Sequence, residues 1–337
     1  MAGQDMPSAT SEPLTWGILA TGRIADEVIP GLKRSAVNRV KAVASRQAER
    51  AELFARRHGL VAAYASYEAL LEDPDVDCVY ICLPNGLHAR WVSQCLKAGK
   101  HVLCEKPLTP TEEEASKLFE TAAEEGRVLA EAFMYRHHPK TRRLGELVSS
   151  GALGQIRTIR SSFNFPVEDP ATDVRYDPLL AGGALLDVGS YCVSLANYLE
   201  GGPPREVSGT ARYAASGVDE QFYGTMIFPS GTVAIFDCSM NSPLSVRVSV
   251  LGSLGEAVVD MPWYAHQSPA TIEVGYIDGR KQRIDASGEN TYYLETEDFA
   301  AVCQGKKPPE VPPEETLRNL RTLQRLAAGA GRRSDHT

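Results

Sequence analysis

A lysine at the end of an apolar run is the first residue of this sequence that could take part in a reaction. Residues 102–104 are apolar and predict a short buried strand; Lys106 follows at its carboxyl end, where Pro107 stops the strand. In an open parallel sheet, ligands bind at that end. Because lysine is seldom buried without a partner, Glu105 and Lys106 form either a structural ion pair or part of a site.

A second candidate lies in the glycine-led apolar segment 182–193, which predicts a helix. Asp187 and Tyr191 are four residues apart, so a helix places them on one face. A tyrosine titrates near pH 10, and a neighbouring ammonium favours the phenolate. If the fold brings Lys106 close, Tyr191 could exchange a proton with an alcohol or ketone, and the two coupled groups could also exchange roles. The structural alternative is a capping Asp187 and a core Tyr191.

The turn expected after the first strand has features of a phosphate-binding turn. It consists of Ala20, Thr21, Gly22, Arg23, Ile24 and Ala25. It keeps the second glycine and the small last residue of the G-x-G-x-x-G/A fingerprint, but alanine replaces the first glycine. Free N–H groups and the helix dipole stabilise a phosphate at such a helix start. We therefore predict that Thr21, Gly22, Arg23 and Ile24 contact a dinucleotide; a plain strand–turn–helix is the alternative.

The end of the second strand indicates which dinucleotide is preferred. An NAD site usually has an acid there for the ribose 2′-hydroxyl, whereas this chain has Ser45 and Arg46 and no acid until Glu49. A hydroxyl and a guanidinium suit a 2′-phosphate, so the sequence predicts NADP over NAD. The alternative is a solvated arginine at the start of a surface helix.

A further loop follows the strand predicted over residues 77–83. Leu83, Pro84 and Asn85 form a rigid turn whose backbone could contact the cofactor ribose or nicotinamide, and His88 lies one turn into the next helix. A capped helix start with a structural histidine is the alternative.

The pattern of elements predicts two domains that would position these residues. Alternating strands and helices over residues 14–132 predict an α/β Rossmann domain with a parallel sheet. Residues 133–328 change to an α+β pattern with an open, mostly antiparallel sheet. This domain is expected to bind the substrate and mediate oligomerisation, and its last helix, 314–328, could pack back on the first domain.

The ends of the chain and its composition bound the remaining possibilities. Residues 1–13 are expected to be a disordered leader without an export signal, and residues 329–337 a loose tail. With 43 acidic and 35 basic residues the net charge is −8, which argues against a nucleic-acid partner. No apolar run approaches the length of a membrane span, so no membrane partner is expected.

The cysteines and histidines indicate a reducing compartment and no metal site. The seven cysteines lack a Cys-x-x-Cys pair and mostly lie in apolar runs, as in a cytoplasmic protein with reduced thiols. His137 and His138 are adjacent, but no third ligand lies at a useful spacing, so no metal is expected.

In order and spacing, these motifs resemble those of the Gfo/Idh/MocA oxidoreductases. The turn at 20–25, the Leu83–Pro84–Asn85 loop with His88, Glu105–Lys106–Pro107 and the helix with Asp187 and Tyr191 carry the resemblance, which runs from about residue 14 to residue 328. Many members have histidine at the position of Tyr191; a tyrosine there resembles the branches that oxidise sugars or reduce keto sugars. Many members also have an acid at the position of Ser194, and this chain departs from them there. The resemblance implies a nicotinamide between Lys106 and Asp187.

The resemblance also implies an activity and roles for the residues. The expected reaction is NADP(H)-dependent hydride transfer to or from a hydroxyl or carbonyl carbon of a sugar-like substrate, in a homodimer or homotetramer formed through the open sheet. Tyr191 and Lys106 would perform acid–base chemistry, Asp187 and Arg175 would contact the substrate, and Glu105 would support the cofactor side. A non-catalytic nicotinamide-binding sensor or scaffold on the same fold is the alternative.

Overall fold

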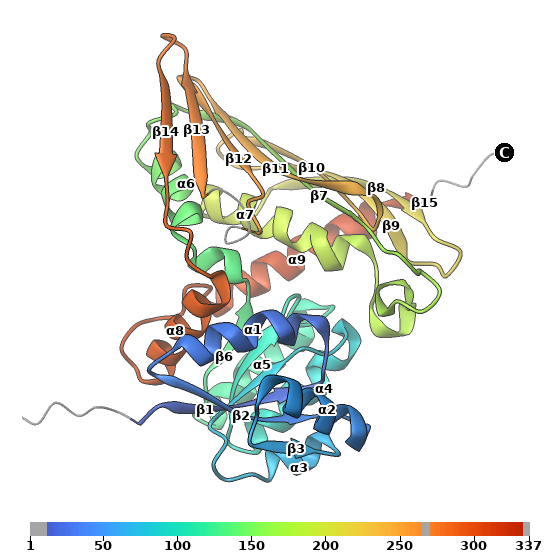
Figure 1. Ribbon diagram of the computed structural model, residues 1–337. Helices are drawn as coiled ribbons and strands as arrows, with labels where there is room; N and C mark the ends of the chain where they lie inside the picture. Colours follow the sequence, from blue (N-terminus) through green and yellow to red (C-terminus); the bar gives the residue numbers. More distant parts are fainter. Residues whose placement is uncertain (1–11, 265–269, 333–337) are drawn as a thin grey trace, which may run out of the picture.

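The protein is described by a computed structural model that covers residues 12–264 and 270–332. Its two halves each contain one β-sheet, and the two sheets lie one above the other in Figure 1. The first sheet belongs to the N-terminal half, and the second forms a wide layer at the top of the view. Most of the expected leader falls outside the described residues, as do residues 333–337 of the expected tail.

The first sheet is entirely parallel and has the strand order β3-β2-β1-β4-β5-β6. Its strands are β1 (Leu14–Leu19), β2 (Asn38–Ala44), β3 (Ala62–Tyr64), β4 (Cys78–Ile81), β5 (His101–Glu105) and β6 (Leu129–Ala132). Its helices are α1 (Arg23–Arg34), α2 (Ala48–His58), α3 (Tyr67–Leu71), α4 (Asn85–Lys97) and α5 (Glu112–Glu124). The strand order reverses between β1 and β4, and that switch point is where an open α/β sheet binds its ligand.

Local sequence signals account for several of these boundaries. The hydroxyl of Thr111 accepts a hydrogen bond from the backbone N–H of Glu114 and starts α5, as the Thr-x-x-Glu spacing predicts. Gly59 ends α2 in the left-handed conformation, where a glycine costs little. All four residues of β4 are buried because helices cover both faces of a parallel sheet.

The second sheet has the order β14-β13-β12-β11-β7-β10-β9-β8-β15 and is antiparallel except at β7–β10 and β8–β15. Its strands are β7 (Ile156–Pro166), β8 (Glu206–Tyr213), β9 (Asp219–Ile227), β10 (Val233–Ser239), β11 (Asn241–Gly252), β12 (Gly255–Asp260), β13 (Thr271–Tyr276), β14 (Lys281–Asp285) and β15 (Gly331–Arg332). The helices of this half are η1 (Met134–His137), α6 (Pro139–Ser149), η2 (Val174–Tyr176), η3 (Pro178–Leu180), η4 (Leu185–Gly189), α7 (Ser190–Glu200), α8 (Thr291–Cys303) and α9 (Pro313–Gly329). The fold class is the predicted one, a Rossmann-like domain followed by a mostly antiparallel sheet.

Some elements differ from the sequence prediction. Strand β14 was not predicted because its residues are polar and exposed and so show no alternation. The helix predicted over 183–199 begins as one π-helical turn, η4, before it continues as α7. Residues 331–332, expected to belong to a loose tail, pair with β8.

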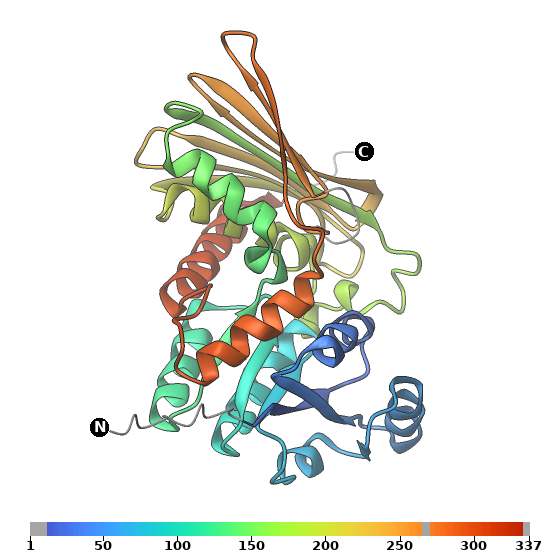
Figure 2. The ribbon, with the colours of Figure 1, turned by 60° about the vertical axis from the view of Figure 1, so that its left-hand side comes forward.

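Two late helices return to the first sheet. Helix α8 packs against α1, and Phe299 of α8 lies 5.3 Å from Trp16 of β1 between ring centroids (Figure 2). Helix α9 packs against α5, where Arg321 forms an ion pair with Glu112. The last two helices therefore join the two halves of the molecule.

One helical stretch is as long and apolar as a membrane span, which was not expected from the sequence. Among the described residues, Pro178–Glu200 is long and apolar enough to cross a membrane by length and composition alone. It is also 67% buried inside the fold, in contact with α9 and β7, as the core helix of a globular domain is. Its apolar character is therefore explained by packing between the second sheet and α9.

Candidate active site

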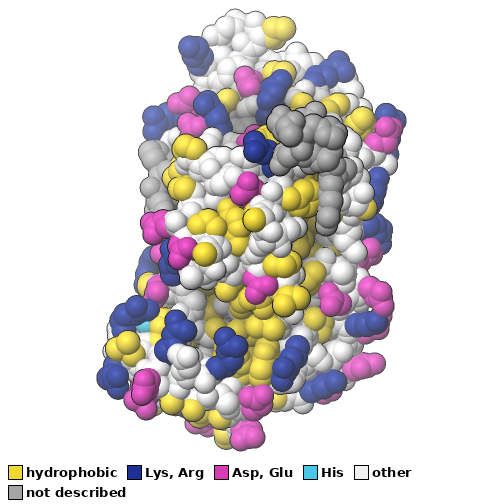
Figure 3. Space-filling model, turned by 90° about the vertical axis from the view of Figure 1, so that its right-hand side faces the viewer, with side chains coloured by type: hydrophobic (Ala, Val, Ile, Leu, Met, Phe, Trp, Pro, Cys, Tyr) yellow, Lys and Arg dark blue, Asp and Glu magenta, His cyan; other side chains and the backbone are white. Residues whose placement is uncertain are grey.

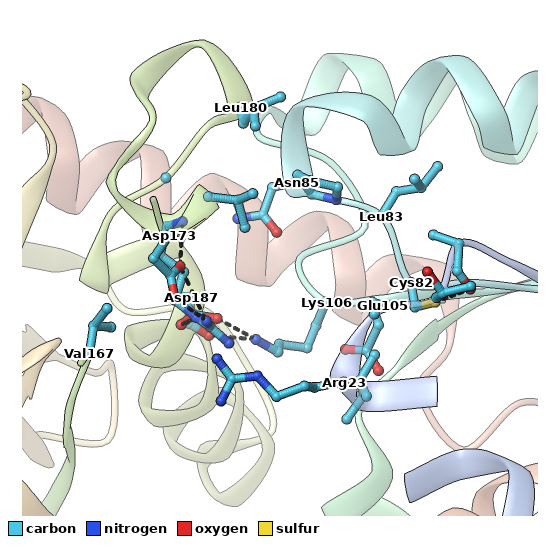
Figure 4. A pocket seen from close by; sticks show the side chains of 18 of the residues that line it. Arg23, Cys82, Leu83, Asn85, Glu105, Lys106, Val167, Asp173, Leu180 and Asp187 are labelled. Atoms are coloured by element: carbon cyan, nitrogen blue, oxygen red, sulfur yellow. Dashed lines mark hydrogen bonds and ion pairs between the residues drawn. The ribbon is translucent and has the colours of Figure 1, made fainter. Parts of the chain in front are cut away.

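A cavity of about 1050 Å³ lies between the carboxyl ends of the first sheet's strands and the loops of the second half. The predicted phosphate turn, the loop after β4 and the end of β5 line one wall, and β7, η2 and η4 line the other. Figure 4 shows Lys106 and Arg23 pointing into this space from the first wall, with Asp173 and Asp187 opposite. Figure 3 shows hydrophobic side chains gathered across the middle of one face, above a row of lysine and arginine side chains.

Lys106 and Asp187 form an ion pair across the cavity. The Lys106 Nζ lies 3.0 Å from Asp187 Oδ1 and donates to the Asp187 backbone oxygen at 2.7 Å. Arg175 Nε holds the other carboxylate oxygen at 2.8 Å and is itself paired with Asp173. Burial would raise the pKa of Asp187, but the two cations lower it below its ordinary value. The carboxylate therefore stays charged and fixes the lysine amine in the cavity.

Tyr191 lies beside this ion pair in an aromatic cluster. The Lys106 Nζ is 5.0 Å from the centre of the tyrosine ring, whose neighbours include Phe163, Phe133 and Trp263 at 5.3, 5.6 and 5.5 Å between centroids. The hydroxyl contacts the Met134 Sδ at 3.5 Å. Aromatic packing thus fixes the ring, while the hydroxyl has only a weak acceptor.

The direction of the pKa shift of Tyr191 differs from the sequence expectation. Burial raises its pKa well above the ordinary tyrosine value, and neighbouring acids, Glu105 first, add to the effect. The ammonium of Lys106, 5.0 Å from the ring centre and paired with Asp187, does not outweigh this burial. The neutral phenol is therefore the resting form, and it can donate a proton.

A buried carboxylate holds the start of the helix that carries Asp187 and Tyr191. Asp219 of β9 accepts a hydrogen bond from the backbone N–H of Leu185 at 2.7 Å, and burial raises the Asp219 pKa to about 7. Gly183 has a φ of +120°, and a Cβ there would lie 2.2 Å from Asp219 Oδ1. Only glycine allows this approach, which explains the glycine before the helix.

The predicted phosphate turn is closely packed. A Cβ on Gly22 would lie 3.2 Å from the Cys82 backbone oxygen, so the turn approaches the end of β4 closely. Ala20, which replaces the first glycine of the fingerprint, has a φ of +83°, a conformation that favours glycine. Thr21, Gly22, Arg23 and Ile24 all line the cavity.

The end of β2 also borders the cavity. Ser45 and Arg46 line it, together with Arg50 and Tyr67. Within the described residues, Arg23, Arg46 and Arg50 form no ion pair with a carboxylate. This part of the cavity therefore presents positive charge that is not neutralised.

The loop after β4 divides into residues that line the cavity and one that does not. Leu83, Pro84 and Asn85 line it, and Asn85 Nδ2 donates to the Ala181 oxygen of the other wall at 3.0 Å. His88 is fully buried behind the wall, with Nε2 2.7 Å from the Leu83 oxygen and Nδ1 2.9 Å from the Pro107 oxygen. The predicted contact of His88 with a cofactor is thus replaced by a link between the loops after β4 and β5.

Glu105 lines the cavity at the end of β5, next to Lys106. The Tyr80 hydroxyl donates a hydrogen bond to its carboxylate, and burial raises the Glu105 pKa. Glu105 therefore lies on the wall of the cavity that the first sheet forms, beside Lys106.

Sequence reasoning missed several residues that line the cavity. They are Arg50 and Tyr67 on the β2 side, Met134 near Tyr191, and Tyr292 of α8. A one-turn spacing from Arg46 to Arg50 was the available signal for the first of these. The others come from distant parts of the chain, and no local pattern marks them.

In the histidine pair 137–138, His137 contacts a carboxylate of helix α8. Its Nδ1 lies 2.7 Å from Asp298 Oδ2. Among residues 12–264 and 270–332, no three histidine, cysteine, aspartate or glutamate side chains are grouped to hold a metal ion.

Several known proteins are similar to this chain in sequence and in fold. Residues 14–133 match the oxidoreductase family with an NAD-binding Rossmann fold, and residues 141–258 match the GFO/IDH/MocA C-terminal domain. D-xylose 1-dehydrogenase (NADP(+)) 2 of Haloferax volcanii is 39% identical over 94% of this chain and 97% of its own. Trans-1,2-dihydrobenzene-1,2-diol dehydrogenase of Sus scrofa is 36% identical over 74% of this chain and 75% of its own.

The solved structure of KijD10, a 3-ketoreductase from Actinomadura kijaniata in complex with NADP and TDP-benzene, has a TM-score of 0.88 to this protein. The two are 30% identical, and the alignment covers 95% of this chain and 98% of that one. Sequence matches to both halves and agreement of the whole fold lead to one conclusion: the chain belongs to the Gfo/Idh/MocA family of oxidoreductases.

Proposed function

We propose that this protein is an NADP(H)-dependent oxidoreductase that transfers hydride between the nicotinamide and a hydroxyl or carbonyl carbon of an uncharged sugar or sugar-like cyclic substrate. The observation that carries the proposal is the meeting of Lys106 from one wall with Asp187 and Tyr191 from the other in a single large cavity. The NADP-linked D-xylose dehydrogenase and the NADP-bound ketoreductase with the same fold support it.

The residues present suit NADP. The start of α1 has no side-chain cap, so its free N–H groups are available to a pyrophosphate, with Arg23 beside them. Arg46 and Arg50 would hold the 2′-phosphate, since their positive charge is otherwise uncompensated, and the Ser45 hydroxyl would donate a further hydrogen bond to it. When bound, the nicotinamide supplies or accepts the hydride.

Replacing Arg46 with alanine is expected to weaken NADPH binding by about ten- to a hundredfold, because a charge-assisted hydrogen bond to phosphate is lost. The affinity for NADH, which lacks that phosphate, should change little. Titration of cofactor fluorescence measures both. Arg56→Ala is the matched control, since Arg56 lies on α2, the helix that follows Arg46, but is 68% exposed and paired with Glu52. Equal losses for NADPH and NADH would contradict the assignment.

The proton chemistry follows from the geometry around Tyr191. In the reducing direction the neutral phenol donates its proton to the carbonyl oxygen, and the Lys106 ammonium stabilises the charge that develops on that oxygen. In the oxidising direction the same groups act in reverse. Asp187 holds Lys106 in place and, with Arg175, offers hydrogen bonds to further substrate hydroxyls.

The charges on the substrate side of the cavity favour an uncharged substrate. Lys106 and Arg175 are already paired with Asp187 and Asp173, and Glu168 adds another acid to the lining. Among the described residues, each lysine or arginine that lines the cavity outside the part assigned to NADP is already paired with a carboxylate, so none is left for a substrate phosphate. Phe163, Phe165 and Tyr264 provide aromatic walls on which the C–H face of a pyranose or cyclohexane ring can pack.

A matched panel of substrates tests both the reaction and the charge preference. D-xylose, D-glucose and trans-cyclohexane-1,2-diol are assayed with NADP⁺, and the corresponding ketones or lactones with NADPH, by following absorbance of the reduced cofactor. We expect kcat/KM for glucose to exceed that for glucose 6-phosphate or TDP-glucose by about tenfold or more, the cost of bringing an unpaired phosphate into the site. A preference for the phosphorylated sugars would refute the substrate class. Cofactor binding without any turnover would favour a non-catalytic role.

We also propose that the protein forms a homo-oligomer through the second sheet. The face of this sheet that turns away from the helices exposes large side chains, among them Tyr223 of β9 and Ile235 of β10, which are 49% and 46% exposed. Exposed apolar residues on neighbouring strands are typical of a sheet that packs on a second copy.

A further inference from the structure

Two cysteines and a histidine meet at the edge of the first sheet opposite the cavity. Cys78 is the first residue of β4 and His101 the first residue of β5, and the two are register partners. On the other side of Cys78, its register partner is Trp16 of β1. Register partners in a parallel sheet point to the same face, so the three side chains form one row.

Helix α8 covers this row with two residues of one face. Phe299 packs on Trp16, and Cys303 lies four residues further on, one helical turn away. There the Cys303 sulfur lies beside the Cys78 thiol and His101, both of which can donate a hydrogen bond to it. His101 Nδ1 already accepts a hydrogen bond from the Val128 N–H at 2.9 Å, so in the neutral ring Nε2 carries the hydrogen.

Cys303 differs from the other cysteines of the chain. The other six are buried, and burial raises the pKa of each of their thiols. Cys303 is only partly buried, and the hydrogen bonds from Cys78 and His101 hold its thiol pKa below the ordinary value. A thiolate that solvent can reach, with a second thiol in contact, is the arrangement of a redox-active cysteine.

We propose that Cys303 and Cys78 form a reversible dithiol site that hydroperoxides oxidise to a disulfide. The Cys303 thiolate attacks one peroxide oxygen; an S–O bond forms, the O–O bond breaks, and the leaving hydroxide takes a proton to become water. The Cys78 sulfur then attacks the sulfenic sulfur, an S–S bond forms, the S–O bond breaks, and a second water leaves with the Cys78 proton. Two thiols are oxidised and one hydrogen peroxide is reduced to two waters.

The disulfide would fasten the last turn of α8 to the first sheet. The first turn of the same helix carries Tyr292, which lines the cavity, so the site acts on an element shared with the candidate active site. Cys303 itself is remote from the cavity and is absent from its lining.

The experiment uses the full reduced chain. Iodoacetamide at pH 7 should alkylate Cys303 roughly tenfold faster, or more, than any other cysteine, because the lowered pKa of its thiol raises the thiolate fraction while burial raises the pKa of the other six thiols and covers them. After a stoichiometric dose of hydrogen peroxide, peptide mass spectrometry should find the peptides of Cys78 and Cys303 joined, with the loss of two hydrogens, and dithiothreitol should separate them. The buried Cys95 and Cys192 in the same digest serve as internal controls.

The variant Cys303→Ser should abolish the linkage and leave Cys78 unreacted, with turnover of the reduced enzyme unchanged. The proposal is overturned if peroxide takes Cys303 to a sulfinic acid while Cys78 stays a thiol, or if Cys303 is alkylated no faster than the buried cysteines. Both outcomes are measured on the wild-type chain, so they do not depend on folding of the variant.

Discussion

Replacing Lys106 with alanine should lower kcat by about 10² to 10⁴, the usual size of a lost acid–base or charge-stabilising group. The reason is the position of the amine, which reaches into the cavity from the end of β5 and is held there by Asp187. Asp187 keeps its bond to Arg175 in the variant, so the helix start is not left with an unpaired carboxylate. Steady-state kinetics with the best substrate of the panel, together with NADPH binding, measures the effect.

The control for this variant is Lys100→Ala. Lys100 is also buried and lies just before β5, but its amine donates only to the Asp73 and Val76 backbone oxygens, far from the cavity lining. Its removal should reduce stability and leave kcat of the folded protein unchanged. If Lys106→Ala turned over within about threefold of the wild type, the proposed role of the lysine would have to be abandoned.

Tyr191→Phe is expected to lower the rate of ketone reduction by a similar factor, about 10² to 10⁴, without a large change in stability. The phenyl ring keeps the packing against Phe163 and Trp263, and the hydrogen bond that is lost goes to the Met134 sulfur, a weak acceptor. Tyr135→Phe is the matched control: its ring is 5.8 Å from Tyr191, but its hydroxyl donates to Ser194 and does not line the cavity. Undiminished turnover of Tyr191→Phe would rule out the phenol as proton donor.

The raised pKa of Tyr191 adds a test by pH. Because burial keeps the phenol protonated through the neutral range, reduction should be nearly independent of pH there. Oxidation requires the deprotonated form, so its kcat should rise with pH, by about tenfold per unit below the pKa. The slope should disappear in Tyr191→Phe. A flat oxidation profile in the wild type would mean that another group accepts the proton.

The sequence determined the architecture and the two ends of the candidate site. The signals that mattered are local, and each specifies a local conformation. They are the alternation of strands and helices, the proline after Lys106, and the glycine-led helix that carries Asp187 and Tyr191 four residues apart. These signals sufficed to predict two sheets, and every residue that they selected for the site except His88 lines the cavity.

Only the tertiary structure decided how the selected groups interact. The carboxylate of Asp187 meets Lys106 across 81 positions of chain, and this contact compensates the lysine charge beside Tyr191. Burial of Tyr191 among rings from η1, β7 and a later loop then raises its pKa, which reverses the shift expected from the ammonium alone. His88 lies behind the wall because both ring nitrogens find backbone oxygens there. Hydrogen-bond partners and desolvation depend on which distant segments meet, and no local pattern encodes that.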